Sequence, residues 1–357
     1  MRARPALFVF AAFAAWCTAA HAQERGFIGP PAIEAVASVT TGSDAVDDPF
    51  VFLDLATTFP IGSRFGAIVR PYAHRLAGGE WEAEMYQLQL RFQSQTRIPI
   101  RVDAGIITSP LGLGTLELRP DLSPAIKMPF YYYMPLPRFE PRSDGVQLMS
   151  GGYPLGAIVS ASGARWDARA GVTDSTPARS RNVFAEDRAA AMRQVVAGGG
   201  LTPIAGLRLG VGVAHGAYRS LEEATGPNTT PVHGADVTVF NLEGEYAIGH
   251  TRFSGEWVRN RFESSLGPAV ARGYFVQAVR TFGPRVFGTV RLVSASGPAY
   301  VNGARERRRM TTMEATAGYR LGRELTARGG YYATRRFGSS DRSHTAIVSL
   351  VWAKRWF

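Results

Sequence analysis

The sequence predicts an all-β fold: a transmembrane antiparallel β-barrel of sixteen strands with a long third outer loop folded into its lumen. Three observations lead to this prediction. Residues 1–22 are typical of an export signal. The rest of the chain has no apolar run long enough for a membrane-spanning helix, and alternating apolar and polar residues cover most of its length. The chain ends on an aromatic residue, Phe357, which closes an amphipathic strand.

The first segment has the three regions of a secretory signal. Arg2 and Arg4 supply the positive start, residues 7–16 form a short apolar run, and Ala20-His21-Ala22 is a small-x-small cleavage site. We therefore expect a signal peptide over 1–22, cleaved after Ala22, and a mature barrel over 23–357 in the outer membrane of a Gram-negative bacterium.

Composition and charge agree with an exported barrel. The chain is 45% apolar with a mean hydropathy of −0.07, which suits a barrel with a wet lumen better than a bundle of membrane helices. The formal charge of +11 falls to +9 when Arg2 and Arg4 are removed with the signal. In a soluble protein such a positive charge would indicate nucleic-acid binding. In an exported barrel we instead expect anionic solutes or lipopolysaccharide as partners and no nucleic acid. Arginine-rich usage in a GC-rich genome is the alternative explanation.

Short turns and longer polar connections alternate along the chain and divide it into strands. The short turns lie at 60–63, 95–97, 162–164, 202–205, 249–250, 283–284 and 322–323. The longer connections lie at 42–48, 75–82, 109–143, 175–191, 218–233, 263–269, 297–309 and 337–342. The predicted strands are 32–41, 49–59, 64–74, 83–94, 98–108, 145–161, 165–174, 192–201, 206–217, 234–248, 251–262, 270–282, 285–296, 310–321, 324–336 and 343–357. Short periplasmic turns and long outer loops are typical of outer-membrane barrels.

Alternation within each strand assigns side chains to lipid or lumen. In strand 83–94, Leu88 and Leu90 face lipid, whereas Gln87 and Gln89 face the lumen. The arginines expected in the lumen are Arg91, Arg101, Arg165, Arg169, Arg208, Arg252, Arg291, Arg320 and Arg328. The acids expected there are Asp54, Asp103, Asp167, Glu243, Glu245, Glu256, Glu314 and Glu324. The arginines either form an electropositive pore wall or pair with these acids, and both interpretations stay open.

The connection 109–143 is the longest and differs from the others. It is rich in proline, apolar and aromatic residues, whereas a solvated loop is rich in glycine, serine and aspartate. Proline lowers the entropy of the free chain, so that ordering the loop costs less, and the apolar residues need a surface to bury against. We therefore expect a constriction loop that folds inward against the wall. Tyr131, Tyr132 and Tyr133 either pack the loop or form a stacking surface for a sugar or aromatic solute.

Residues 105–124 resemble a known family. Gly105-Ile-Ile-Thr-Ser-Pro-Leu-Gly and Arg119-Pro-Asp-Leu-Ser-Pro are similar to the phosphate-selective branch of Gram-negative outer-membrane porins, and the predicted architecture resembles porins throughout 23–357. The resemblance implies a passive channel lined by arginine ladders and lysine clusters, commonly a homotrimer. The chain departs from that pattern at Arg355, where the family usually has an apolar residue. The third loop also carries nearly balanced charges: Arg119, Lys127, Arg138 and Arg142 with Glu117, Asp121 and Glu140.

The function predicted from these observations is an outer-membrane porin, a passive diffusion channel for small hydrophilic solutes with an anion preference. The residues expected at the pore lining or constriction are Arg91, Arg101, Asp103, Arg119, Asp121, Lys127, Arg138 and Arg142. The residues expected to contact lipopolysaccharide, unless they are merely solvated, are Arg305, Arg307, Arg308 and Arg309. The alternative is a non-conducting structural or adhesion barrel. We expect no enzyme, cofactor or metal site, because the sequence has no Gly-x-Ser-x-Gly motif and no zinc-like pair of histidines.

Overall fold

The computed structural model describes residues 31–43, 49–76, 79–117, 119–140, 146–150, 152, 154–178, 193–218 and 236–356. The predicted signal peptide and Phe357 lie outside these residues. Within the described ranges, no helix has the length and apolar character needed to cross a membrane.

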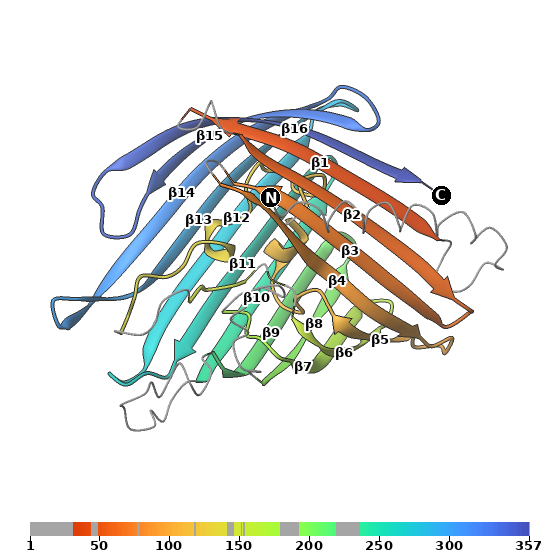
Figure 1. Ribbon diagram of the computed structural model, residues 1–357, viewed down its shortest axis with the longest axis horizontal. Coiled ribbons are helices and arrows are strands. Elements are labelled where there is room, and N and C mark those ends of the chain that lie inside the picture. Colours follow the sequence, from red (N-terminus) through yellow and green to blue (C-terminus); the bar gives the residue numbers. More distant parts are fainter. Residues whose placement is uncertain are drawn as a thin grey trace.

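Sixteen strands close into one antiparallel barrel, in which each strand pairs with its neighbours in sequence and β1 pairs with β16 (Figure 1). The bounds are β1 Ala32–Gly42, β2 Phe50–Ile61, β3 Phe65–Arg75, β4 Trp81–Gln93, β5 Ile100–Ile106, β6 Leu155–Ser162, β7 Trp166–Thr173, β8 Gln194–Ile204, β9 Leu207–Ala217, β10 Asp236–Ile248, β11 Thr251–Phe262, β12 Ala269–Thr281, β13 Val286–Val301, β14 Ala304–Arg320, β15 Leu325–Arg335 and β16 Arg342–Trp356. The predicted antiparallel barrel of sixteen strands is confirmed. We call the end that carries the turns after β2 and β4 the short-turn end and the opposite end the long-loop end.

The two faces of the wall follow the predicted alternation. Leu88 and Met313 point outward and are 50% and 55% exposed. Their inward-facing neighbours Gln87, Gln89 and Glu314 are buried. Because side chains of a strand alternate between its two faces, polar residues line the interior and apolar residues cover the outside.

The connection predicted at 297–309 is wrong. β13 and β14 continue to Val301 and Ala304 and meet in a tight turn. Asn302 and Gly303 form this turn with φ values of 50° and 84°, the positive values that suit a two-residue hairpin. The sequence here has no clear apolar alternation. Ala299 is buried on one face of the hairpin, whereas the charged residues that follow the turn, 305–309, are exposed or half-buried.

The predicted strand 145–161 is also wrong at its start, because β6 begins at Leu155. Leu148 and Met149 are fully buried beneath the long connection instead of pairing in the sheet. The Ile107 N–H donates to the Pro154 carbonyl at 2.9 Å. This hydrogen bond joins the two ends of the long connection, which therefore runs from 107 to 154. Proline cannot donate to a sheet ladder, which explains why the strand starts only after it.

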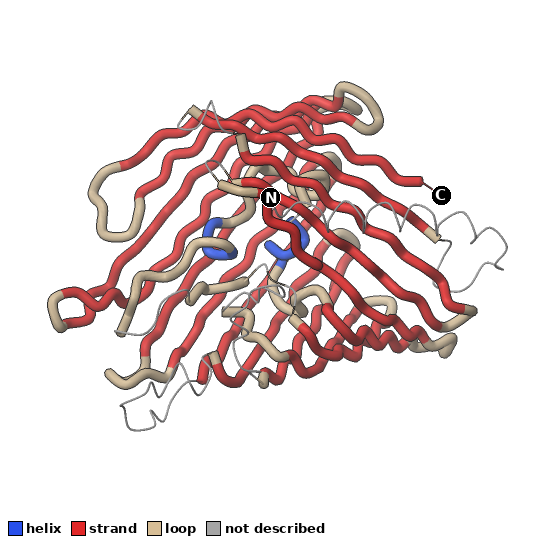
Figure 2. The backbone as a smooth tube through the Cα atoms, viewed as in Figure 1, coloured by secondary structure: helices blue, strands red, loops and turns tan. Residues whose placement is uncertain are grey.

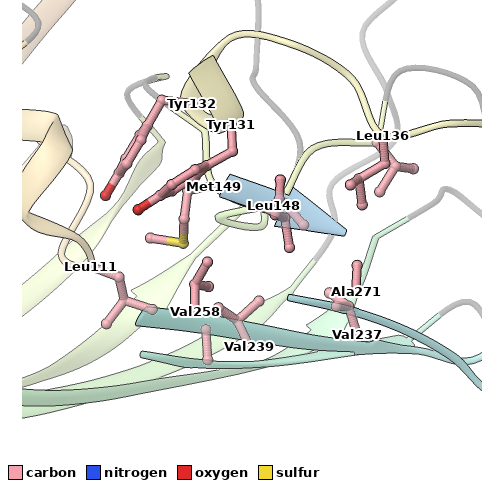
Figure 3. Packing of buried hydrophobic residues seen from close by; sticks show 14 of the residues in the cluster. Leu111, Tyr131, Tyr132, Leu136, Leu148, Met149, Val237, Val239, Val258 and Ala271 are labelled. Carbon is pink, nitrogen blue, oxygen red and sulfur yellow. The ribbon is translucent and has the colours of Figure 1, made fainter. Parts of the chain in front are cut away.

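The long connection contains two short 3₁₀ helices, η2 (Leu113–Glu117) and η3 (Phe130–Tyr132). Tyr132 and Leu148 from this connection belong to one buried cluster with Val239 and Val258 of β10 and β11 (Figure 3). Both valines are fully buried. The inner wall thus carries an apolar patch under part of the connection, and burial of each valine side chain contributes about 1.5–3 kcal/mol.

Candidate functional site

The long connection is held against the inner side of the wall, where η2 and η3 lie within the outline of the barrel (Figure 2). Glu256 on β11 is the first anchor. Its carboxylate accepts hydrogen bonds from the Leu113 N–H at 2.5 Å, the Tyr131 hydroxyl at 3.1 Å and the Tyr132 hydroxyl at 2.8 Å. One buried acid thus fixes both η2 and η3. Among the described residues no ion pair joins Glu256 to an arginine, so the pairing interpretation does not extend to this acid.

The two tyrosine hydroxyls are kept as donors by their surroundings. Tyr131 and Tyr132 are each 1% exposed. Burial and the adjacent Glu256 carboxylate raise the pKa of both hydroxyls well above the ordinary value, because the charged phenolate would be desolvated and repelled. Their packing and hydrogen bonds favour the interpretation that these tyrosines fix the loop. Tyr133, by contrast, is 45% exposed.

Arg291 on β13 is the second anchor. Its guanidinium, with the side chain 1% exposed, bridges Glu117 of η2 at 2.6 Å and Glu314 of β14 at 2.7 Å. It also donates to the Lys127 carbonyl. Glu314 in turn accepts from the Ile126 N–H at 3.1 Å. This network joins both ends of residues 117–127 to the wall.

Arg328 on β15 is the third anchor. One guanidinium nitrogen donates to three carbonyls of the connection, those of Pro120 at 3.0 Å, Ser123 at 2.8 Å and Ala125 at 3.0 Å. A turn that presents three carbonyls to one buried cation is held in a single arrangement, since without Arg328 the carbonyls of Pro120 and Ser123 lose their donor, while that of Ala125 keeps the Ser123 hydroxyl.

A cavity of about 320 Å³ lies beside the first residues of the long connection. Its lining comes from β5, β6, β7, β9 and β10 and from residues 107–115. Asp103 on β5 accepts from Arg91 at 2.7 Å and from Arg101 at 3.0 Å. The Gln89 amide donates to the same carboxylate at 3.1 Å. Three donors from β4 and β5 thus converge on one acid.

A second shared carboxylate lies across the cavity on β10. Glu243 accepts from Arg208 at 2.8 Å and from Arg169 at 3.5 Å. Arg208 also pairs with Asp167 at 3.0 Å. Glycines of the neighbouring strands leave space for these side chains, because a Cβ at Gly210 would lie 2.6 Å from the Glu243 side chain.

The arginines that share these acids are more accessible than the acids. The side chains of Arg91, Arg101, Arg169 and Arg208 are 25%, 47%, 24% and 25% exposed, whereas those of Asp103 and Glu243 are 10% and 3% exposed. Asp167, at 34%, is more exposed than the other two acids. The cavity is lined by three arginines, Arg101, Arg169 and Arg208, and by the acids Asp103, Glu243 and the half-buried Glu245, and the guanidiniums are more accessible than Asp103 and Glu243.

The structure brings together Arg91, Arg101 and Asp103 of the predicted constriction set. Arg119 instead pairs with Glu34 on β1 and with Asp121, each at 2.7 Å, and no described contact joins it to the cavity arginines. The other predicted residues occupy separate places: the Lys127 ammonium lies 5.3 Å from the Tyr332 ring, the Arg138 carbonyl accepts from Tyr300, and Arg142 lies outside the described residues. Their role in a constriction stays a prediction.

The outer arginines lie in β14 rather than in a loop. Arg305 donates to the carbonyls of Phe139 and Gly267, each at 2.9 Å, and so ties two connections together. The other three differ in their partners: Arg307 contacts Ser296 at 3.3 Å, Arg308 pairs with Glu306 at 3.6 Å, and Arg309 is exposed. Contact with lipopolysaccharide stays a prediction for all four.

Arg169, Arg208 and Glu243 were not singled out for the site by the sequence. Alternation placed each of them in the lumen, but no local signal relates β7, β9 and β10 to the start of the long connection. Among the described residues, no group of three or more His, Cys, Asp or Glu side chains could hold a metal ion.

No family model and no curated protein matches the chain. Solved structures of outer-membrane proteins are similar to it. OmpT of Vibrio cholerae in a trimer form is 11% identical, with 91% of this chain and 98% of that chain covered and a TM-score of 0.54. Salmonella typhi OmpF in complex with daunomycin is 10% identical, with 91% and 97% covered and a TM-score of 0.57. A porin is 13% identical, with 91% and 99% covered and a TM-score of 0.50. At these identities the likeness shows the fold.

Proposed function

We propose that the protein is a porin of the bacterial outer membrane, a passive channel for small hydrophilic solutes with a preference for anions. The observation that carries this proposal is the polar cavity beside the long connection, where the guanidiniums of Arg101, Arg169 and Arg208 are more accessible than the carboxylates Asp103 and Glu243 that they share. A passive channel needs no reaction and no cofactor. Selectivity comes from the width and the charge of the passage.

The barrel fold supports the location. A closed sheet leaves no unpaired edge, and outward-facing apolar side chains suit contact with hydrocarbon. Export by a signal peptide cleaved after Ala22 is part of the same proposal. A homotrimer is proposed by analogy with OmpT of Vibrio cholerae, for which a trimer form is described.

The charge of the cavity gives a test of the anion preference. We expect the purified protein in planar bilayers to conduct in ohmic steps, and its reversal potential in a potassium chloride gradient to indicate chloride preference. Replacing Arg101 and Arg169 together by glutamine should move that potential toward zero, because two of the guanidiniums that face the cavity are removed while Glu243 and Asp103 stay. Replacing Arg97 and Arg323 together by glutamine is the control, since it removes the same charge from two exposed turns at the short-turn end.

Two outcomes would contradict the proposal. Cation preference of the unmodified protein, or an unchanged potential in the double variant, would assign a structural role to these arginines. A barrel that inserts but never conducts would favour the second candidate, a structural or adhesion barrel. The observation that supports this candidate is the firm anchoring of the long connection inside the wall.

A further inference from the structure

Arginines gather on the outer face of the barrel near the long-loop end. Arg259 on β11 lies directly opposite Arg272 on β12. Arg272 is opposite Ser296 on β13, which in turn is opposite Arg309 on β14. The strand register therefore places these three arginines in one lateral line across four neighbouring strands. We call Arg259, Arg272 and Arg309 the arginine row.

The arginine row faces outward. The neighbours of Arg259 in sequence, Val258 and Asn260, are both 0% exposed and face the interior. Because alternate residues of a strand face opposite sides, Arg259 points away from the barrel. Ala271 and Met310 are buried on the interior in the same way. All three arginines of the row are exposed.

The row contains an unbalanced positive charge. Like charges directly opposite each other on neighbouring strands destabilise a sheet, and the row sets Arg259 against Arg272. No ion pair joins either one to an acid in the part of the chain that the structure describes. Asp236 and Glu263 lie beyond the row at the end of β10 and β11, where the Glu263 N–H donates to the Asp236 carbonyl at 2.9 Å. An external anion would relieve this repulsion.

The level of the row indicates which anion it meets. Two residues nearer the middle of the barrel, Trp257 lies opposite Tyr274, and the Trp257 ring packs against Phe240 at 6.1 Å. Leu242, the register partner of Trp257 on β10, is 46% exposed, and Val276, two residues farther in than Tyr274, is 52% exposed. Aromatic girdles mark the boundary between hydrocarbon and headgroups in membrane barrels. Arg259 and Arg272 follow Trp257 and Tyr274 by two residues toward the long-loop end, the side of such a boundary on which lipid phosphates lie.

We propose that the arginine row binds the phosphates of lipopolysaccharide in the outer leaflet, a proposal that rests on the outer-membrane location given above. Arginine forms bidentate hydrogen bonds with phosphate oxygens, and such bonds are stronger than those between neutral groups. Arg259 and Arg272 lie directly opposite each other and can share one phosphate, whereas Arg309 lies beyond Ser296. A glycolipid with two phosphates therefore occupies more of the row than a phospholipid with one. Compared with the four arginines that the sequence suggested as lipopolysaccharide contacts, the proposal adds Arg259 and Arg272. It excludes Arg305, because its guanidinium donates to backbone carbonyls.

The test compares two triple variants of the full-length protein. The first carries Arg259→Gln, Arg272→Gln and Arg309→Gln. The control carries Arg64→Gln, Arg97→Gln and Arg323→Gln, which remove the same charge from exposed positions at the short-turn end. Each protein is incubated with lipopolysaccharide in detergent, and the glycolipid that stays bound per barrel is measured by native mass spectrometry at several salt concentrations. We expect retention several-fold lower in the row variant and unchanged in the control.

The same measurement with phosphatidylglycerol and with dephosphorylated lipopolysaccharide separates the sources of phosphate. Equal retention of lipopolysaccharide by the row variant and the control would overturn the proposal. An equal loss of phosphatidylglycerol would overturn it too, because the row would then attract any anionic lipid. Conductance in pure phospholipid bilayers is recorded in parallel and should be the same for both variants. A barrel that binds the glycolipid but never conducts would contradict the porin proposal and leave the lipid site intact.

Discussion

Replacement of Arg291 by leucine is expected to lower the free energy of unfolding by about 3–5 kcal/mol, the range for removing one partner of a buried ion pair. The variant leaves the Glu117 and Glu314 carboxylates, 8% and 2% exposed, without their shared cation. It also removes the donor to the Lys127 carbonyl. We therefore expect residues 117–127 to detach from β13 and β14. Urea unfolding in lipid vesicles, followed by tryptophan fluorescence, measures the loss of stability.

Limited proteolysis separates local release from global unfolding. Trypsin should cut the variant at Lys127 while the barrel still migrates as a folded band, and the unmodified protein should resist. Arg320→Leu is the matched control, because it removes an exposed arginine of the same strand pair whose side-chain contacts are the Pro284 carbonyl and the Phe287 ring, with none to the long connection among the described residues. Equal urea midpoints and equal resistance in Arg291→Leu and the control would show that the network does not hold the connection.

Replacement of Glu256 by alanine should have the second largest effect. The change leaves the Leu113 N–H and the hydroxyls of Tyr131 and Tyr132 buried without their acceptor. Each buried donor left unpaired costs about 1–3 kcal/mol. We expect a lower urea midpoint, and in planar bilayers a noisier open channel, because η2 and η3 lose the one group that fixes both.

A single tyrosine variant, Tyr131→Phe, is the control for Glu256→Ala. Tyr131→Phe removes one hydroxyl but leaves the carboxylate with two other donors, so that no buried group is left without a partner. A loss well below that of Glu256→Ala is expected. If Glu256→Ala and Tyr131→Phe have the same urea midpoint and the same current noise, the carboxylate is not the anchor that the contacts indicate.

Local sequence was sufficient for the barrel wall. β11 was predicted at 251–262 and is found at Thr251–Phe262, because a Gly249-His250 turn and alternation over the strand specify its start, length and faces. The same short-range signals place Arg91, Arg101 and Asp103 together, since β4 and β5 form one hairpin. Alternation failed where charged residues occupy both faces of a strand, as in 305–309 after the turn at Gly303, and where apolar residues pack in a separate buried cluster, as at Leu148.

The contacts that shape the interior depend on the closed barrel. Glu256 and Tyr132 are 124 positions apart, and Arg169 and Glu243 are 74 apart, yet each pair meets in the lumen. Alternation with a period of two tells whether a residue faces the lumen or the outside. Which residue it meets across the lumen depends on the register of all the strands that lie between the two along the barrel wall. The wall could thus be read from neighbours in sequence, whereas the cavity and the anchors of the long connection arise only when β1 pairs with β16 and the opposite sides of the barrel are brought together.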